Sequence, residues 1–516
     1  MPITVEIKVS PSEIENEIFI KQEIRNNCKE TLPEKFFYTI ARRNIDARAK
    51  SIWYVLKIEV HFTEITQTKV EFNFKNVRNE KEVYIIGAGP CGYFAALHLL
   101  RLGIKPIVIE RGKDAQKRRR DLKAIQQEGI VNPHSNYCFG EGGAGTYSDG
   151  KLYTRSDKRG NIKDVLNLLV YHGASEEILV DVHPHIGSNK LPALVQNIRK
   201  TIIEHGGEVR FDNYLEDLEC NSDKIINITV NGTKIKAENI ILCTGHSARD
   251  IFELLARNKI EIDCKEFALG VRIEHSQTLI DEVQYKQNPR HPNLPAASYS
   301  LACQVNNKGV FSFCMCPGGL IVPASTSPGE IVVNGMSLSR RDSPFANSGM
   351  VTAVDEKDFS AFNKFGSLQG MHYQKSIEQK VFNAGDGTQR APSQRLMDFL
   401  NNKVSSSLPE SSYIPGLCSV SLQSILPKEI ITRLKDGLIE FGKKQPRYLT
   451  NEAVLVATES RTSSPVKIPR DKLTCQHIRI KNLFPAGEGA GYAGGILSAA
   501  LDGIRVAEAL YQLKVE

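Results

Sequence analysis

The chain has 516 residues, 41% of them hydrophobic and 24% charged, which is typical of a globular protein with about two to four domains. Its net charge of +7 is mild, so the chain lacks the basic face of a dedicated nucleic-acid binder, although nucleic acid is not excluded. The eleven cysteines are scattered and follow no signal peptide, which indicates reduced thiols and a cytoplasmic location.

Residues 1–78 form the first expected unit. Alternating apolar and polar residues predict a strand in ITVEIKV, and a polar helical stretch follows as far as Cys28. Two further strands are predicted in segments rich in aromatic and β-branched residues, FFYTIARR and SIWYVLKIEVHF. These elements predict a small α+β domain, with a ferredoxin-like arrangement as one option. The polar stretch 75–82 is the expected linker to the next domain.

A nucleotide-binding motif begins at Val83. An apolar strand leads into Gly87, Gly89 and Gly92, which have the spacing G-x-G-x-x-G, and a helical stretch follows. The first glycine allows a tight turn, the second lets the backbone approach a pyrophosphate, and the third lets the helix pack against the strand. This motif explains the apolar run 83–100 better than a membrane span does.

The second strand of this motif ends on Glu110. A carboxylate at this position accepts hydrogen bonds from both ribose hydroxyls of an adenosine, and it repels a 2′-phosphate. The motif therefore predicts FAD or NAD rather than NADP. Arg111, and after it Arg119, are candidates to reach the pyrophosphate. A charge run such as KRRRD is more often a solvated helix face.

A glycine-rich loop follows in the segment 132–155. Gly142 and Gly143, with glycines on either side, allow successive backbone N–H groups to face an anion or a flavin edge. Thr146 adds a hydroxyl donor, and the ionisable residues Asp149 and Lys151 are candidates for a substrate pocket. The alternative is a surface loop whose glycines only turn the chain.

Several short strands are predicted before residue 242, with a hairpin turn at Asn231-Gly232. The next segment, ENIILCTGHSARD, resembles the Ala-Thr-Gly segment by which flavoproteins of the two-dinucleotide-fold type return to their FAD domain. The resemblance implies that Thr244 and Gly245 contact the cofactor, with Cys243 in place of the usual alanine. Residues 79–250 are therefore the expected first part of an FAD-binding domain.

Residues 251–472 are expected to form an inserted α+β domain that covers the flavin ring and holds a small-molecule substrate. Arg461 precedes a run of three hydroxyl residues, a polar patch able to bind a carboxylate or phosphate, and is the third candidate for the substrate pocket. A charged surface loop is the alternative. No metal site is expected, because His183 and His185 lack suitably spaced partners.

The cysteines are expected to have no redox function. The sequence has neither the C-x-x-x-x-C pair nor the second G-x-G-x-x-G that disulfide reductases of the glutathione-reductase type carry. Only one residue separates Cys314 from Cys316, and along an extended strand the pleat then fixes a geometry that does not allow an unstrained disulfide. Cys138 is likewise expected to be a packing residue.

Residues 473–516 are expected to complete the FAD-binding domain. A short apolar strand leads to Gly487 and Glu488, and Gly494, Gly495 and Ile496 open a final helix. This pattern resembles the closing motif of two-dinucleotide-fold flavoproteins. In that motif a carboxylate binds the ribitol of FAD and the last helix directs its positive end at the flavin. With three such motifs in order, the chain is expected to bind FAD.

The whole chain is similar to a family of poorly characterised bacterial FAD-dependent dehydrogenases with a p-hydroxybenzoate-hydroxylase-like fold. Further segments that carry this resemblance are RNIDARAK, GGLIVPAST, VVNGMSLSRRD and RTSSPVKIPRD. The resemblance implies the α/β class: a Rossmann-type two-dinucleotide-binding FAD domain, an inserted α+β substrate domain and a small α+β N-terminal domain.

We therefore expect an FAD-dependent oxidoreductase of the dehydrogenase type, in which the flavin carries the hydride or electron transfer. NAD(P)H is a candidate transient donor, although no sequence feature requires it, and no side chain stands out as a general base. Two alternatives stay open. One is an FAD-dependent RNA-modifying protein whose N-terminal RRNIDARAK segment contacts a phosphate backbone. The other is a non-catalytic flavin-binding interaction module.

Overall fold

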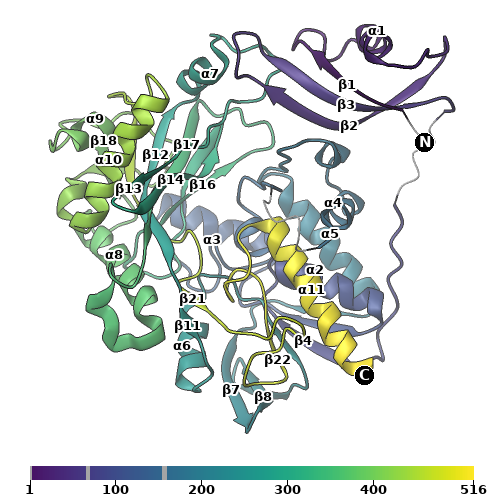
Figure 1. Ribbon diagram of the computed structural model, residues 1–516. Coiled ribbons are helices and arrows are strands. Elements are labelled where there is room, and N and C mark those ends of the chain that lie inside the picture. Colours follow the sequence, from purple (N-terminus) through teal and green to yellow (C-terminus); the bar gives the residue numbers. More distant parts are fainter. Residues whose placement is uncertain (1–2, 65–69, 154–159, 516) are drawn as a thin grey trace.

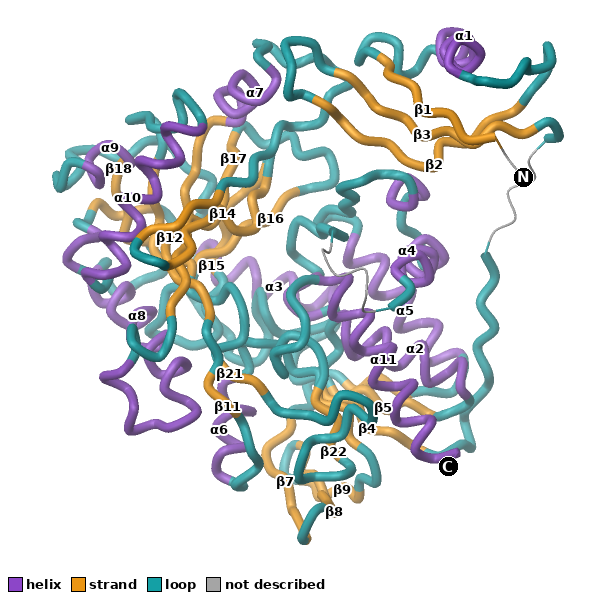
Figure 2. Tube along the Cα trace, viewed as in Figure 1, coloured by secondary structure: helices purple, strands orange, loops and turns teal. Residues whose placement is uncertain are grey.

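The computed structural model describes residues 3–64, 70–153 and 160–515. The chain forms an N-terminal domain, a parallel-sheet domain and an inserted domain (Figures 1 and 2). Residues 65–69 of the expected first unit lie outside the described residues, as do Thr154 and Arg155 at the end of the glycine-rich segment. None of the described helices is long and apolar enough to cross a membrane.

The N-terminal domain is a three-stranded antiparallel sheet of order β1-β3-β2, with one helix packed against it. Its elements are β1 (Ile3–Val9), α1 (Glu17–Asn27), β2 (Phe37–Asp46) and β3 (Trp53–His61). All four were predicted, and the α+β class is confirmed. A ferredoxin-like fold needs four strands and two helices, so that option is wrong for the described part of this domain.

The parallel-sheet domain contains a five-stranded parallel sheet of order β22-β10-β4-β5-β6. Its elements are β4 (Glu82–Ile86), α2 (Pro90–Leu102), β5 (Lys105–Ile109), α3 (Ala115–Gln127), α4 (Ile162–Tyr171), α5 (Leu191–Glu204), β6 (Glu208–Arg210), β7 (Leu215–Asn221), β8 (Lys224–Val230), β9 (Thr233–Lys236), β10 (Ile240–Leu242), α6 (Arg249–Arg257), β22 (Leu483–Pro485) and α11 (Ile496–Val515). The predicted Rossmann-type α/β architecture is therefore present.

Both faces of this sheet are covered. In β4, Val83 and Ile85 pack into the core formed with α2, α5 and α11, whereas Tyr84 and Ile86 pack toward β7–β9 and α6. Such two-sided burial explains the continuous apolar run in the sequence. Helices α2 and α11 lie side by side (Figure 1) although almost 400 residues separate them. The closing segment thus returns to the first nucleotide motif.

Two local expectations have different outcomes. The predicted hairpin is confirmed, because Val230 pairs with Thr233 across Asn231-Gly232, and both turn residues have positive φ angles of 46° and 74°. The expected linker 75–82 is not wholly exposed. Val77 is fully buried in the core of the parallel-sheet domain, so the end of the segment 1–78 packs with that domain.

The inserted domain is built on a seven-stranded sheet of order β13-β14-β17-β12-β20-β18-β19. Its elements are β11 (Asp263–Cys264), β12 (Phe267–Ser276), α7 (Gln277–Tyr285), β13 (Ala302–Val305), β14 (Lys308–Cys316), β15 (Gly319–Pro323), β16 (Val333–Ser337), β17 (Phe345–Val354), α8 (Gln369–Ala384), β18 (Ala391–Arg395), α9 (Leu396–Leu400), β19 (Leu417–Ser419), α10 (Lys428–Lys444), β20 (Val454–Glu459) and β21 (Val466–Lys467). Its core is continuous with that of the N-terminal domain.

Candidate cofactor and substrate site

A cavity of about 330 Å³ lies between the parallel-sheet domain and the inserted domain. Its walls combine the ends of β4, β5 and β10 with the glycine-rich loop, the start of α11 and parts of β14 and β16. The residues predicted from sequence that line it are Gly87, Gly89, Glu110, Arg111, Gly143, Asp149, Lys151, Thr244, Gly245, Arg461, Glu488, Gly494, Gly495 and Ile496. Segments far apart in the sequence therefore meet at one site.

The other predicted residues support the walls. A Cβ on Gly92 would lie 2.0 Å from the carbonyl oxygen of Gly87, so this glycine allows the close helix packing expected of it. The Thr146 hydroxyl donates to the carbonyl of Glu141 at 2.7 Å and is buried, and a Cβ on Gly142 would collide with it. The expectation that Thr146 offers a donor to the cofactor is therefore wrong. The N–H of Gly487 donates to Asp502.

Glu110 is buried at the end of β5, where its carboxylate joins the two glycine-rich turns. One oxygen accepts from the N–H of Ala88 at 2.8 Å, and the other accepts from the N–H groups of Gly112 and Gly140, each at 2.9 Å. A carboxylate has about four acceptor positions. Three are used within the protein, so Glu110 can accept from one ribose hydroxyl rather than from the two expected.

The N-terminus of α2 suits a pyrophosphate. Gly89 is the N-cap residue and provides no side-chain hydrogen bond to the first turn, and Pro90 follows as the first helical residue. Both residues line the cavity. The first-turn N–H groups of a helix that lacks a side-chain cap bind anions well, with help from the helix dipole.

Arg111 is engaged elsewhere. Its guanidinium donates to Asp250 at 2.8 Å and lies over the ring of Phe139, 4.5 Å from the centroid. Arg119 is exposed on α3 and does not line the cavity. Arg119 is therefore not placed as a pyrophosphate ligand, whereas Arg111 borders the cavity and its contact with the pyrophosphate stays a prediction.

Arg118 is the arginine of the charge run that supports the site, and the sequence analysis missed it. Its side chain is fully buried and donates to three backbone carbonyls, those of Asn136, Glu141 and Gly143, at 2.8–2.9 Å. It thus anchors the glycine-rich loop to α3. The buried face of α3 recurs at Ala115, Arg118, Leu122 and Ile125. This helical spacing was the signal that could have identified Arg118.

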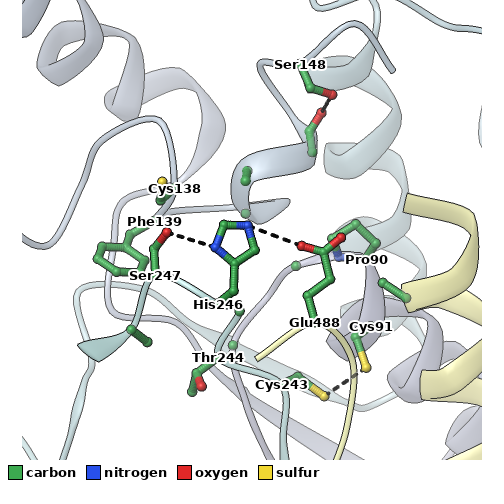
Figure 3. Close-up of a pocket in the computed structure, with 18 of the residues that line it drawn as sticks. Pro90, Cys91, Cys138, Phe139, Ser148, Cys243, Thr244, His246, Ser247 and Glu488 are labelled. Carbon is green, nitrogen blue, oxygen red and sulfur yellow. Dashed lines mark hydrogen bonds and ion pairs between the residues drawn. The ribbon is translucent and has the colours of Figure 1, made fainter. Parts of the chain in front are cut away.

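Glu488 lies between the start of α11 and His246 (Figure 3). One carboxylate oxygen accepts from the N–H of Gly495, and the other lies 3.5 Å from Nε2 of His246. Nδ1 of His246 lies 3.3 Å from the hydroxyl of Ser247. Burial lowers the pKa of His246, against the opposing effect of Glu488, so the imidazole is neutral at pH 7. His246 directly follows the Thr-Gly motif, but its contact with Glu488 was not predicted from the sequence.

The two candidates from the glycine-rich loop lie beneath the inserted domain. Asp149 accepts from Arg341 at 2.6 Å and from Ser337. Burial works to raise the pKa of Asp149, but Lys151 and Arg341 outweigh it and hold this pKa at about 2. The ammonium of Lys151 donates to the carbonyl of Met315. Asp149 is therefore ionised and paired within the protein, and Lys151, 3.8 Å from it, is one of the cations that border the cavity.

The cysteine segment departs from a regular strand. The β14–β17 register shifts between Phe313 and Cys316, and Cys314 has a left-handed φ of +43°. Cys314 and Cys316 both line the cavity. The sequence analysis assumed that Cys314 and Cys316 lie on a regular extended strand. That assumption is wrong, because a bulge at Cys314 changes the direction of the chain.

Arg461 belongs to a buried ion network. Its guanidinium contacts Glu378 at 2.9 Å, Glu330 at 3.1 Å and the Thr326 hydroxyl at 2.6 Å. Arg249 pairs with the same two carboxylates. These contacts hold Arg461 within the protein, and the binding of a substrate anion by this residue stays a prediction. The network joins α6 of the parallel-sheet domain to α8 of the inserted domain.

This network makes stability depend on pH. Burial, with Glu378 nearby, raises the pKa of Glu330 from 4.5 to about 7. Between pH 4.5 and 7, Glu330 therefore keeps a proton in the folded protein that it loses in the unfolded protein. The contribution of this proton to the free energy of unfolding is complete below pH 4.5 and is lost as the pH rises through 7. The loss is about 3 kcal/mol. About 2 kcal/mol of this loss falls between pH 5.5 and 7.5, and urea unfolding at these two pH values should show it in the wild type and not in Glu330→Gln. The exposed control Glu452→Gln should behave as the wild type; equal pH slopes in all three proteins would contradict the assignment.

The cavity fits a flavin dinucleotide. A Cβ built on Gly245, Gly494 or Gly495 meets nothing within 4 Å, although all three residues line the cavity. Bare backbone therefore borders open space at the end of β10 and at the start of α11, which suits a thin, planar ring. No group of three or more His, Cys, Asp and Glu residues in the described part of the chain is arranged to hold a metal ion.

Comparisons with known proteins agree with this fit. Residues 80–127 match a family described as FAD binding domain, residues 266–462 match "FAD-dependent protein, C-terminal domain-like", and residues 1–61 match a domain of unknown function, DUF8436. An uncharacterized protein of Clostridium beijerinckii is 41% identical over 496 residues, which cover 91% of each chain.

Several solved structures show weaker likeness. CtdE in complex with FAD is 13% identical, with 84% of this chain and 85% of that chain covered and a TM-score of 0.33. The flavin-dependent brominase Bmp2 is 11% identical, with 85% and 80% covered and a TM-score of 0.37. A geranylgeranyl bacteriochlorophyll reductase-like protein of Thermoplasma acidophilum is 11% identical, with 85% and 79% covered and a TM-score of 0.33. These values are too low to bear on the reaction.

The family matches and the relative together decide the cofactor and the kind of protein. The FAD-binding match covers the strand, glycine turn and helix that form one wall of the cavity. The relative matches across all three domains. The chain therefore belongs to the same family as the uncharacterized Clostridium beijerinckii protein, and its cofactor is FAD.

Proposed function

We propose that this flavoprotein is an oxidoreductase of the dehydrogenase type, in which a small-molecule donor transfers hydride to FAD beneath the inserted domain. FAD, when bound, supplies the ring that accepts the hydride. The supporting observation is that one cavity joins two sets of residues. Gly89 and Gly494, which are expected to contact the cofactor, border it on one side, and the inserted domain contributes Phe313, Cys314 and Asn334. A donor held by the inserted domain therefore lies in the same space as the cofactor.

The residues around the cavity would divide the work. Glu110 and the N-terminus of α2 would hold the ribose and pyrophosphate, and Glu488 would exchange its contact with Gly495 for a ribitol hydroxyl. Lys151 provides a positive charge at the donor end, which suits a donor that carries a carboxylate or phosphate. His246 and Glu488 can hold one proton between Nε2 and a carboxylate oxygen.

Anaerobic mixing tests this proposal. NADH, NADPH and small organic acids are added one at a time to the FAD-bound protein without oxygen, and flavin absorbance is followed. If the protein is a dehydrogenase, its flavin absorbance should fall with at least one donor. Lys151→Met should weaken the binding of that donor about tenfold, which corresponds to the loss of one charge-assisted hydrogen bond. Lys200→Met, an exposed lysine on α5, is the control and should match the wild type.

Other outcomes identify the other functions. Flavin that dithionite reduces but no organic donor reduces would contradict the proposal and favour a non-catalytic module. Rapid oxygen consumption that depends on a second organic substrate would indicate a monooxygenase or halogenase instead. RNA modification has less support, because Arg43 of the RRNIDARAK segment pairs with Asp181 at 2.6 Å and with Glu177. That arginine joins two domains of the chain and is not directed to a phosphate backbone.

A further inference from the structure

We propose that Cys314 and Cys316 form a second redox group beside the flavin, a dithiol that closes to a disulfide and exchanges two electrons with FAD. This inference rests on the proposed oxidoreductase function, and it reverses the expectation drawn from the spacing of the two cysteines. The chemical class of the final acceptor is a disulfide, which the dithiol reduces by thiol–disulfide exchange.

The two cysteines border the same cavity on a bent segment of β14. The left-handed residue Cys314 breaks the alternation of the strand, so the two side chains do not follow the pleat. Sγ of Cys316 lies 3.2 Å from the carbonyl oxygen of Cys314, so the Cys316 side chain points back toward the backbone of Cys314. Both residues line the cavity that also contains Gly494 at the start of α11.

Two cations surround Cys316. The ammonium of Lys151 lies 3.8 Å from its sulfur, and the guanidinium of Arg272 lies 3.6 Å from it. Arg272 is fully buried and is fixed by Glu459 at 2.6 Å and by Asn347 at 2.7 Å. Nearby fixed positive charge stabilises a thiolate, which is the reactive form in disulfide exchange. Desolvation raises the pKa of Cys314 to about 11, against the effect of Lys151, so Cys314 is the thiol that remains protonated at neutral pH.

Another pair of cysteines, Cys91 and Cys243, lacks the cation contacts that Cys316 has. Sγ of Cys243 lies 3.3 Å from Sγ of Cys91 beneath the first glycine turn (Figure 3). The contact with Cys243, together with burial, raises the pKa of Cys91 well above its ordinary value. Cys91 is therefore held as a thiol. Inert packing, as in this pair, is the alternative against which the proposal for Cys314 and Cys316 is tested.

The proposed reaction is a two-electron exchange between FAD and the Cys314–Cys316 pair. The Cys314–Cys316 disulfide would accept two electrons and two protons from reduced FAD, so its S–S bond would break, two thiols would form and the flavin would be left oxidised. The dithiol then reduces a disulfide substrate: one new S–S bond forms between the cysteines, the substrate S–S bond breaks, and two substrate thiols leave. The hydride donor of the proposed function restores reduced FAD.

The test counts electrons and thiols in the FAD-bound protein. Anaerobic dithionite titration of air-equilibrated wild type should consume about four electrons per FAD, two for the flavin and two for a disulfide. Cys314→Ser and Cys316→Ser should each consume about two. Alkylation in denaturant should find two fewer free thiols in the air-equilibrated wild type than the eleven cysteines of the reduced chain. Cys303→Ser, in β13 of the same sheet, is the control and should still consume about four electrons.

The outcomes separate the two proposals. A wild type that binds FAD but takes up only two electrons, with all thiols free, would overturn the dithiol and leave the oxidoreductase intact. A four-electron uptake that persists in both serine variants would also overturn it and assign the disulfide to another pair, such as Cys91 and Cys243. Four electrons in the wild type, but no flavin reduction by any organic donor, would instead support the dithiol and contradict the proposed hydride donor. At half reduction, a long-wavelength thiolate–flavin absorbance that Lys151→Met weakens is expected as well.

Discussion

Gly494→Val is expected to give a folded, colourless protein. A Cβ at this position meets no protein atom within 4 Å and points into open space at the cavity wall, so the valine side chain would occupy volume that the flavin needs. The backbone itself is not strained by the change, because the left-handed glycine of this turn is Gly495, with φ +104°. Steric overlap of this kind costs about 3 kcal/mol, or on the order of a hundredfold in FAD affinity.

The measurement is bound flavin per chain after purification, together with thermal unfolding of the FAD-free protein. Gly309→Val is the matched control. It adds the same side chain to β14, where the nearest atom to a Cβ is 3.8 Å away, and it should retain FAD. A yellow Gly494→Val protein with the wild-type flavin content would show that the ring does not lie against the start of α11.

Glu110→Ala is expected to weaken both FAD binding and the empty fold. Loss of a charged hydrogen bond to the ribose costs about 1.5–3 kcal/mol, which is about ten- to a hundredfold in affinity. The structure adds a second effect. The N–H groups of Ala88, Gly112 and Gly140 lose their shared acceptor, and each buried unsatisfied group costs about 1–3 kcal/mol. Removal of this one carboxylate therefore loosens both glycine turns.

A flavin titration and urea unfolding of the FAD-free protein measure the two effects separately. Glu204→Ala removes an exposed carboxylate from α5 and should change neither value. If Glu110→Ala loses stability but keeps its FAD affinity, the residue supports the turns without contacting the ribose. If both values stay at those of the wild type, the hydrogen-bonding arrangement around Glu110 is itself contradicted.

Local sequence patterns identified the elements that carry the cofactor. The apolar run at Val83, the glycines that follow it and the turn at Asn231-Gly232 each specify backbone structure over a few residues. Such patterns reflect steric limits on φ and ψ and the period of the buried side chains, so they need no knowledge of distant contacts. For this reason the strand, turn and helix of the nucleotide motif lie where they were predicted.

The roles of individual charged residues were harder to predict. Arg461 stands beside hydroxyl residues in sequence, yet in the fold it pairs with Glu330 and Glu378 from two other segments. Arg118 was overlooked within a charge run, yet it is the member that α3 turns inward to the glycine-rich loop. A buried charge needs partners, and those partners come from segments that sequence spacing does not connect.

The sequence by itself determined the parallel-sheet architecture, the choice of FAD and the place of the closing helix, because each depends on short motifs whose backbone demands are local. Only the tertiary structure decided which side chains border the donor end of the cavity. The bulge at Cys314 arises from the register of β14 against β17, and Lys151 and Arg272 reach Cys316 from two other segments. Side-chain chemistry at this end depends on long-range packing, since electrostatic and hydrogen-bonding partners are set by distance in space and not by distance along the chain.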